Sequence, residues 1–277
     1  MSSAAPADRY AVIGYPISHS WSPFIHGMFA KQLGHTLSYT RMEVAPERLR
    51  DDVTAFFATG GKGLNVTLPH KQEACLLTRY RTPRAEIAGA VNTIAITDDG
   101  LLGDNTDGAG LVTDLTHNLA LPLENTRILL LGAGGAARGV LGPLLSAGPD
   151  YLEIANRNVE RATQLAKEFA PLGAVAGCGF DGISPGQTFD LILNATSASL
   201  QDALPPIPAS AVGPVTLCYD MAYGKGDTPF TRWARNAGAG RAETGWGMLV
   251  EQAAEAFLLW RGIKPDTRPV LEAVKQM

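Results

Sequence analysis

Short apolar runs alternate with amphipathic stretches over roughly the first hundred residues. The apolar runs have the length and side-chain types of β-strands, and they lie at residues 10–14, 37–44, 63–68 and 91–97. The stretches between them place apolar residues three or four positions apart, which is the period of a helix. Strands that alternate with helices in this way are typical of an α/β domain.

Start and stop signals mark the helices and one turn in this part of the chain. Ser22 as N-cap, Pro23 at the first helical position and Gly34 after the last turn predict one helix. A second helix is predicted from Pro46 to Gly60, with its apolar residues on one face. The dipeptide Asp99-Gly100 predicts a tight hairpin turn, because both residues tolerate positive φ.

From about residue 108 to 244 the chain alternates strand and helix more strictly. Predicted strands lie at 127–131, 151–155, 189–194 and 215–219, with helices at 109–119, 134–146, around 162–169 and from Thr228 to Gly238. A strand, a helix and a second strand in this order form a parallel β-α-β unit. A last apolar helix, at 248–260, ends before Gly262 and Pro265.

The composition narrows the class of partner. With 45% hydrophobic and 18% charged residues, the chain is typical of a globular protein, and its net charge of −4 lacks the basic footprint of a nucleic-acid-binding protein. The expected partner is therefore a small molecule. Cys75, Cys178 and Cys218 form no Cys-x-x-Cys pair, which fits a reducing cytoplasm. Because the sequence shows neither a signal-peptide pattern nor a membrane-spanning apolar tract, we expect a cytoplasmic protein. Whether it forms a homodimer is left open by the sequence.

A glycine-rich turn follows the first strand of the β-α-β unit. The strand runs directly into Gly132, Ala133, Gly134, Gly135 and Ala136, where the next helix begins. Such a turn points the first N–H groups of the helix outward, and a glycine lets a diphosphate approach the backbone closely. The strand before it, the helix after it and a second strand at Tyr151 supply the context that a dinucleotide-binding motif requires.

The end of the second strand indicates which dinucleotide is bound. NAD-binding domains normally carry an acid there, which holds the ribose 2′-hydroxyl, but this strand ends in Asn156, Arg157 and Asn158, with Arg161 shortly after. If both arginines lie on the opening turn of the helix, their guanidinium groups face the same way and match a 2′-phosphate. We therefore expect NADP; the alternative is two solvated arginines on a surface helix.

Several polar residues in the first stretch have both a structural and a functional interpretation. Ser20 and Ser22 lie beside a helix start and suit a carboxylate, although Ser22 also suits an N-cap. Asn65 and Thr67 share one face of a predicted strand, which ends in a proline turn that presents Lys71. A lysine just after a strand is also typical of a solvated surface charge. Asp107 belongs to Asn105-Thr106-Asp107, which is also compatible with a simple helix cap. The histidines lack metal-ligand spacing, so no metal site is predicted.

At this point the chain resembles the shikimate dehydrogenase family over nearly its whole length. The resemblance rests on motifs in the family's order: His19-Ser20-x-Ser22-Pro23, Asn65-Val66-Thr67-x-Pro69-x-Lys71, Gly89-Ala90-Val91-Asn92-Thr93, Gly103-Asp104-Asn105-Thr106-Asp107-Gly108, Gly132-Ala133-Gly134-Gly135-Ala136, Asn156-Arg157 and Gly247-Met248-Leu249-Val250-x-Gln252. Two departures are Trp21 between the serines and Asn158 in place of the usual threonine.

The resemblance implies roles for individual residues. It implies a catalytic pair of Lys71 and Asp107, and substrate contacts from Ser20, Ser22, Asn65, Thr67, Asn92, Tyr223 and Gln252. It implies cofactor contacts at the glycine-rich turn, at Asn156, Arg157, Asn158 and Arg161, and at Met221 and Gly245. The implied activity is the reversible, NADPH-dependent reduction of 3-dehydroshikimate to shikimate.

The implied fold is α/β with two domains. Residues 1–107 and 245–277 form an N-terminal α/β substrate domain to which the last helix returns, and residues 108–244 form a doubly wound, Rossmann-like NADP-binding domain. The closest alternative is a sibling enzyme acting on quinate or an aminoshikimate, for which the cofactor can be NAD. A non-catalytic nucleotide-sensing protein is a further alternative, but such a protein would lack Lys71 or Asp107, and both are present.

Overall fold

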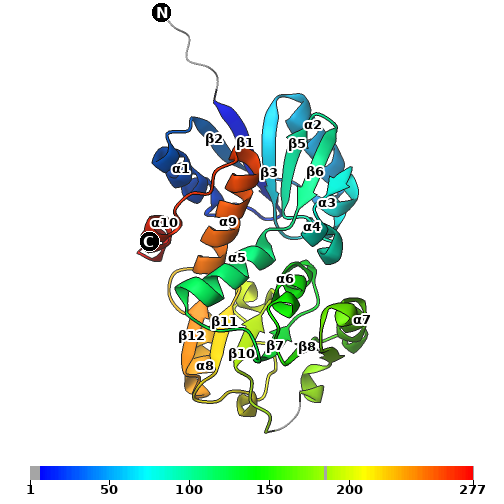
Figure 1. Cartoon of the computed structure of the whole chain (residues 1–277), viewed down its shortest axis with the longest axis vertical. Helices are drawn as coiled ribbons and strands as arrows, with labels where there is room; N and C mark the ends of the chain where they lie inside the picture. The colour runs from blue at the N-terminus through cyan, green and yellow to red at the C-terminus, as the bar shows by residue number, and fades with distance from the viewer. Residues whose placement is uncertain (1–6, 184–185, 277) are drawn as a thin grey trace, which may run out of the picture. The chain divides into compact units, whose positions relative to one another are not determined.

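Two six-stranded sheets, each with helices packed on it, organise the chain (Figure 1). The computed structural model describes residues 7–183 and 186–276. These residues divide into two units: the first holds the chain up to Asp107 together with Val250–Gln276, and the second runs from Gly108 to Leu249. The sequence placed the return to the first unit at residue 245, whereas the division falls inside the long helix α9 (Trp246–Arg261).

The sheet of the first unit is mixed. In spatial order its strands are β2 (Leu37–Glu43), β1 (Asp8–Gly14), β3 (Gly61–Val66), β5 (Thr93–Thr97), β6 (Gly100–Asp104) and β4 (Tyr80–Arg81). Strand β5 runs antiparallel to both β3 and β6. The start of β5 therefore lies between the ends of its two neighbours, with Thr93 opposite Asn65 on one side and Asp104 on the other.

Helices cover both faces of this sheet. One face packs against α2 (Leu49–Ala58), α3 (Lys71–Leu77) and α4 (Pro83–Ala88), and the other is covered by α1 (Ser22–Leu33) with α10 (Arg268–Lys275) beside it and by the end of α9 (Figure 1). Trp260 of α9 lies so close to the backbone of β3 that a Cβ at Gly63 would come within 2.4 Å of its Nε1 atom. That Nε1 donates to the Ile94 carbonyl at 3.1 Å, which fixes α9 to the sheet.

Two local predictions in this unit are wrong. Ser22 does not cap α1: it is the first helical residue, and Trp21 occupies the N-cap position without a capping bond from its own side chain. The hairpin between β5 and β6 exists, but Gly100 is paired with Thr97 inside the sheet, so the turn residues are Asp98 and Asp99. Positive φ is needed only at Gly100, at 129°, just after the turn.

Other elements begin or end away from their predicted positions. Strand β3 stops at Val66, so Thr67 lies outside it, and Lys71 opens helix α3 instead of standing in a turn. The predicted start of β11 at Val215 is wrong because this residue is outside the strand and 80% exposed. Short elements that the hydrophobic pattern did not single out include β4, β9 (Val175–Cys178), β12 (Arg241–Thr244), α4 and α10.

The second unit contains an entirely parallel sheet. Its spatial order is β12, β11 (Leu217–Asp220), β10 (Leu191–Asn194), β7 (Arg127–Leu131), β8 (Tyr151–Ala155) and β9. Counted along the chain this is the order 3-2-1-4-5-6 of the Rossmann fold, with the strand order reversing beside β7. The predicted fold class, an α/β chain with a Rossmann-like second domain, is confirmed.

Helices cover both faces of this sheet as well. On one side lie α5 (Asp107–Thr113), which continues as a π-helical turn at Asp114–Asn118, α6 (Gly135–Ser146) and α7 (Val159–Phe169). On the other lies α8 (Pro229–Asn236), whose N-cap Thr228 accepts a hydrogen bond from the Thr231 amide. Strand β7 contributes Leu129 and Leu131 to one core and Ile128 and Leu130 to the other, as expected for a strand buried on both faces.

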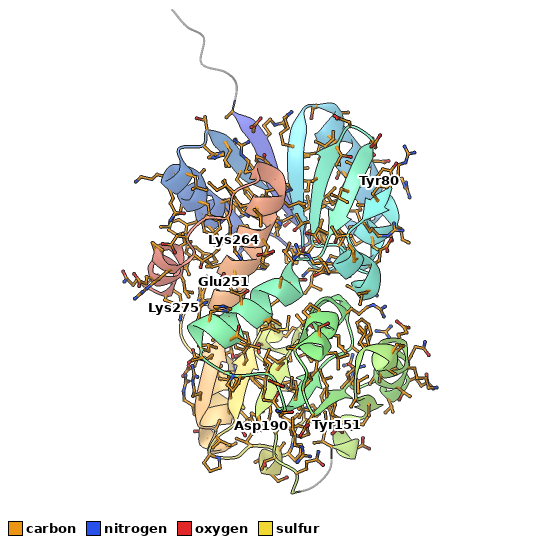
Figure 2. The ribbon with its side chains drawn as sticks, viewed as in Figure 1. Tyr80, Tyr151, Asp190, Glu251, Lys264 and Lys275 are labelled. Atoms are coloured by element: carbon orange, nitrogen blue, oxygen red, sulfur yellow. The ribbon has the colours of Figure 1, made fainter. Side chains whose placement is uncertain are left out.

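A partly buried ion-pair network, centred on the buried Asp104, ties α9 to the sheet of the first unit. Arg84 on α4 donates through Nε and Nη2 to Asp104 at 2.7 and 2.5 Å, and through Nη1 to Glu255 of α9 at 3.2 Å. Burial by itself raises the pKa of Asp104, but bonds from Arg84, Thr82 and the Asn105 amide outweigh it and hold that pKa below its usual range. Glu255 also accepts from Lys264 at 2.7 Å, beyond the end of α9 (Figure 2).

We expect Arg84→Met to lower the free energy of unfolding by about 3 kcal/mol near pH 7, because it leaves a buried carboxylate unpaired. A carboxylate with a depressed folded-state pKa stabilises the fold above its unfolded-state pKa, about 3.9, and that stabilisation is lost as pH falls. The difference between variant and wild type should therefore shrink below about pH 4. Urea unfolding as a function of pH measures this.

The matched control is Arg48→Met, which removes an arginine from the exposed pair with Asp52 and should leave stability nearly unchanged. An Arg84→Met difference that does not vary with pH would show that the arginine acts by packing alone.

Candidate active site

Polar side chains gather at one edge of the first unit's sheet. Asn65 lies near the end of β3, Asn92 immediately precedes β5, and Asp107 follows β6 as the first residue of α5. The antiparallel pairing of β5 with both neighbours brings these three positions together. All three are buried, at 5%, 2% and 4% exposure, although each carries a polar or charged side chain. Buried polar groups need hydrogen-bond partners, and here they supply them to one another.

Lys71 and Asp107 form a short ion pair at this edge. Nζ of Lys71 lies 2.6 Å from Oδ2 of Asp107, and the two side chains are only 12% and 6% exposed. The second oxygen, Oδ1, accepts from Nδ2 of Asn92 at 2.8 Å. Both carboxylate oxygens therefore have a donor, which holds the ammonium group in one position. The pair joins residues 36 positions apart in the sequence.

Gln252 reaches the same cluster from helix α9. Its Oε1 lies 3.3 Å from Nδ2 of Asn92 and 3.4 Å from Oγ1 of Thr106, and the residue is 9% exposed. The predicted residues Lys71, Asn92, Asp107 and Gln252 thus lie together although they come from four elements or loops.

Asn65 joins this cluster through residues that sequence reasoning missed. Its Nδ2 donates to Oγ1 of Thr93 at 3.1 Å, and Thr93 in turn donates to Oδ1 of Asn92 at 2.9 Å. Its Oδ1 accepts from the Tyr39 hydroxyl at 2.6 Å. Thr93 was visible only as part of a family motif, and Tyr39 only as one residue of a predicted strand.

The two serines form a separate pair. Ser20 donates to the Ser22 hydroxyl at 3.2 Å, and its oxygen accepts from the Ser22 amide at 3.3 Å; both residues are buried, at 4% and 5% exposure. Ser20 thus satisfies the amide at the helix start. Within the described part of the chain, no side-chain hydrogen bond connects Ser20, Ser22 or Thr67 to the Lys71 cluster.

The glycine-rich turn of the second unit has the geometry expected of an anion-binding turn. Gly132 adopts φ 107°, and a Cβ there would come within 3.2 Å of the Ala195 carbonyl oxygen. Gly134, the N-cap of α6, is exposed, and a Cβ there would meet nothing within 4 Å. A side chain at Gly134 would therefore project into open space at the start of a twelve-residue helix, where the first N–H groups have no partner within the helix.

The prediction that Arg157 and Arg161 share the opening turn of a helix is wrong. Helix α7 begins at Val159 with Asn158 as its N-cap, whose Oδ1 accepts from the Arg161 amide at 3.0 Å. Arg157 therefore precedes the helix, and helical spacing does not relate the two side chains. Asn156 donates to the Asn158 carbonyl at 2.9 Å, which shapes this loop, and both arginines are exposed at the end of β8.

Three further predicted residues lie near the ends of β11 and β12. Met221 directly follows β11, and a Cβ on Gly245 would come within 2.4 Å of its carbonyl oxygen, so the two backbones touch. Tyr223 packs its ring on Trp246, with centroids 5.0 Å apart. This group is on the same sheet edge as the glycine-rich turn, because the strands are parallel and both follow strand ends.

Comparison with known proteins covers almost all of the chain. The pattern of the shikimate dehydrogenase substrate binding domain matches residues 12–94, that of shikimate / quinate 5-dehydrogenase matches 114–201, and that of the shikimate 5′-dehydrogenase C-terminal domain matches 245–275. A shikimate dehydrogenase (NADP(+)) from Methylococcus capsulatus is 55% identical over 97% of this chain and 96% of its own length. The chain belongs to the shikimate dehydrogenase family.

Solved structures agree with this membership. Shikimate 5-dehydrogenase from Thermus thermophilus, in complex with NADP(H) and shikimate, is 32% identical with a TM-score of 0.85, covering 97% of this chain and 99% of that one. An Ael1 enzyme from Pseudomonas putida is 47% identical with a TM-score of 0.89, covering 96% and 98%.

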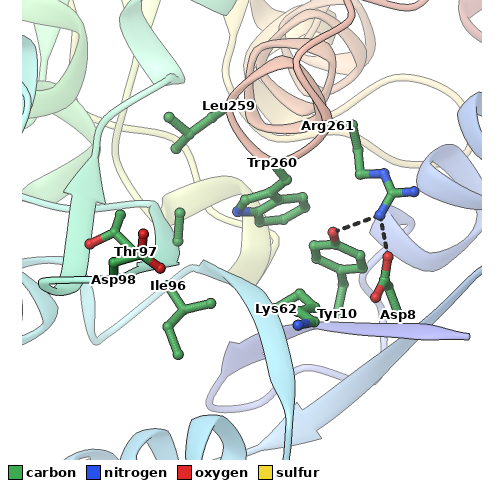
Figure 3. Close-up of a pocket in the computed structure, with 10 residues that line it drawn as sticks. Asp8, Tyr10, Lys62, Ile96, Thr97, Asp98, Leu259, Trp260 and Arg261 are labelled. Carbon is green, nitrogen blue, oxygen red and sulfur yellow. Dashed lines mark hydrogen bonds and ion pairs between the residues drawn. The ribbon is translucent and has the colours of Figure 1, made fainter. Parts of the chain in front are cut away.

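A further hollow in the first unit lies away from these residues. It has a volume of about 540 Å³ and is bounded by the starts of β1 and β3, the end of β5 and the last turn of α9, with Tyr10, Lys62, Trp260 and Arg261 among its ten lining residues (Figure 3). Arg261 pairs there with Asp8 and contacts the Tyr10 hydroxyl. None of the lining residues is among the predicted site residues.

The described residues show neither a cluster of metal ligands nor a membrane-spanning helix. No group of three or more His, Cys, Asp or Glu side chains in these parts of the chain is arranged to hold a metal ion. Among the helices formed by residues 7–183 and 186–276, none combines the length and the apolar character required to cross a membrane.

Proposed function

We propose that this family member catalyses the NADPH-dependent, reversible reduction of 3-dehydroshikimate to shikimate. The observation that carries the proposal is the buried Lys71–Asp107 pair, 2.6 Å apart, set among amides that can bind hydroxyl groups. A solvated surface lysine would not be 12% exposed with its ammonium fixed by a carboxylate. The 55% identity to a shikimate dehydrogenase (NADP(+)) supports both the substrate and the cofactor.

Lys71 has the position of a general acid and base. NADPH supplies a hydride to the ketone carbon when it is bound. Negative charge then develops on the ketone oxygen, and the Lys71 ammonium donates a proton to that oxygen; in the oxidative direction its neutral amine takes the proton back. Asp107 holds Nζ in place through a bond of 2.6 Å.

The remaining polar residues of the first unit suit a carboxylic acid with several hydroxyls. Buried polar groups without partners cost about 1 to 3 kcal/mol each, so the substrate hydroxyls need hydrogen bonds in the site. We assign these bonds to Asn65, Thr67, Asn92 and Gln252. Ser20 and Ser22 are proposed to hold the carboxylate: Ser20 donates to Ser22, so the hydroxyl hydrogen of Ser22 remains available to an anion.

The second unit is proposed to bind NADPH. The open space before Gly134 and the start of α6 fit a diphosphate, and Asn156, Arg157, Asn158 and Arg161 offer amide and guanidinium donors to the 2′-phosphate. Met221 and Gly245 are proposed to contact the nicotinamide end of the cofactor, and Tyr223 is proposed to contact the substrate. This assigns residues 108–244 to the cofactor, and residues 1–107 and 245–277 to substrate binding and catalysis.

Quinate is the second candidate substrate, because the region 114–201 matches a pattern that covers both shikimate and quinate dehydrogenases. Turnover with shikimate and quinate, each with NADP and NAD, decides between them; preference for quinate or for NAD would contradict the proposal. We further propose a cytoplasmic location, because Cys75, Cys178 and Cys218 form no disulfide.

Lys71→Ala should lower kcat by about two to four orders of magnitude, the range for loss of a general acid, with little change in NADPH affinity. Steady-state kinetics and a fluorescence titration of NADPH measure the two quantities. Lys62→Ala, which removes an exposed lysine from the same unit, is the control and should keep wild-type kinetics. A Lys71→Ala enzyme with near-normal kcat would remove this residue from the reaction.

Arg157→Ala should weaken NADP(H) binding about tenfold to a hundredfold, because a charge-assisted bond is worth about 1.5 to 3 kcal/mol, and should leave NAD(H) binding nearly unchanged. Titration of both cofactors against both proteins measures the effect. Lys167→Ala removes a charge from the last turn of α7 and controls for general electrostatics. Equal weakening of NADP(H) and NAD(H) would mean that Arg157 does not read the 2′-phosphate.

Gly134→Val should leave the unfolding temperature nearly unchanged, because the backbone at φ −96° and ψ −169° accepts any residue and a Cβ meets no protein atom. The same side chain would fill the space proposed for the diphosphate, so NADPH binding should weaken about tenfold or more. Gly27→Ala, at another position with open space, is the control. Unchanged NADPH affinity in Gly134→Val would place the diphosphate elsewhere.

A further inference from the structure

We propose that Thr93 and Tyr39 are positioning residues that fix the Asn65 amide so that it accepts, and does not donate, a hydrogen bond at a ring hydroxyl of the substrate. The inference deepens the proposed function and rests on it. Thr93 is completely buried and Tyr39 is half-buried in β2. Their hydroxyls contact Asn65 from opposite ends of its amide, Thr93 at Nδ2 and Tyr39 at Oδ1.

Asp107 determines which group donates and which accepts in the series of hydrogen bonds that leads through Asn92 and Thr93 to Asn65. An ionised carboxylate can only accept hydrogen bonds, so Asn92 must turn its Nδ2 toward Oδ1 of Asp107, at 2.8 Å. The carbonyl Oδ1 of Asn92 then faces the other way, where it accepts from the Thr106 amide at 2.8 Å and from the Thr93 hydroxyl at 2.9 Å. The orientation of the first amide is thereby settled.

Thr93 passes this direction on to Asn65. A hydroxyl has a single hydrogen, and that of Thr93 is committed to Asn92. Its oxygen can therefore only accept from the neighbouring strand, and Nδ2 of Asn65 donates to it at 3.1 Å. The second hydrogen on Nδ2 points to the Asn92 carbonyl at 3.4 Å. The donors of Asn65 are thus both used inside the protein.

Tyr39 completes the arrangement from the other side. Its hydroxyl donates to Oδ1 of Asn65 at 2.6 Å, which fixes this oxygen as the accepting end of the amide. The Tyr39 ring is held by His26, which stacks on it at 4.4 Å with 7° between the planes. Burial lowers the pKa of His26 to about 3 and outweighs the opposing effect of the neighbouring Asn65 side chain, so this supporting ring stays neutral near pH 7.

A position that only accepts distinguishes between substrates. A hydroxyl placed there donates to Asn65, whereas a keto or ether oxygen would bring two lone pairs together. Sites built to hydrogen-bond a hydroxyl reject compounds that lack it far more strongly than apolar pockets reject a small change of size. The chain of directed bonds from Asp107 through Thr93 therefore sets a hydroxyl preference at a distance from the reacting carbon.

Thr93→Val, Thr93→Ser and Tyr39→Phe test the inference, with kcat and KM measured for shikimate and for NADP separately. Thr93→Val should raise the KM for shikimate about tenfold to a hundredfold, because it frees the Asn65 amide to reorient and leaves polar groups unpaired. Thr93→Ser keeps the hydroxyl and should restore KM to within about threefold of wild type. Tyr39→Phe should raise the same KM with kcat unchanged.

Several controls separate positioning from general damage. Thr97→Val removes an exposed hydroxyl from the same strand and should behave as wild type. The KM for NADP should be unchanged in every variant. In the double variant Thr93→Val with Tyr39→Phe, the two effects should be less than additive, since both act through one amide.

A wild-type shikimate KM in Thr93→Val, or a Thr93→Ser enzyme as impaired as Thr93→Val, would overturn the inference. If Thr93→Val does not fold, Tyr39→Phe decides, and an unchanged shikimate KM in that variant overturns it as well. Wild-type turnover of shikimate is the separate arm that tests the proposed function itself.

Discussion

The carboxylate of Asp107 is the group on which the polar architecture of the first unit depends. It is buried, it can only accept, and it meets one cation and one amide, Lys71 and Asn92. Asn92, Thr93 and Asn65 are then oriented in turn, because each must offer a donor or an acceptor that matches the preceding group. A neutral residue at this position would leave the amides free to turn over, so one charge supplies both the electrostatics of the pair and the order of its surroundings.

Remote parts of the sequence have to be in place before that carboxylate is useful. Asn92 lies between β3 and β6 because β5 is antiparallel to both, and Gln252 arrives on α9. The same helix is anchored by Arg84, which joins α4, β6 and α9 through partly buried ion pairs, and by the indole of Trp260 on the bare backbone of Gly63. Helix α9 therefore contributes both to the site, through Gln252, and to stability, through its contacts with Arg84 and Gly63.

The sequence predicted the fold class, four of the strands of the second unit and the glycine-rich turn, because these depend on local periodicity and backbone freedom. It placed Lys71 and Asp107 together only through family resemblance, since a pair 36 positions apart leaves no trace in spacing. Thr93 entered only as part of a family motif, and Tyr39 only as one residue of a predicted strand. The prediction that Arg157 and Arg161 share a helical turn failed for a local reason: Asn158 caps α7, which excludes Arg157 from the helix.

The shared helix α9 has a consequence for synthesis of the chain on the ribosome. All residues of the second unit, up to Leu249, leave the exit tunnel before Val250–Gln276, which belong to the first unit. The unit that is translated first is thus completed last, and its sheet waits with Ile94 and Gly63 uncovered until Trp260 arrives. The second unit needs no such late segment, so it can fold while the earlier strands are still open to chaperones or to association with another chain.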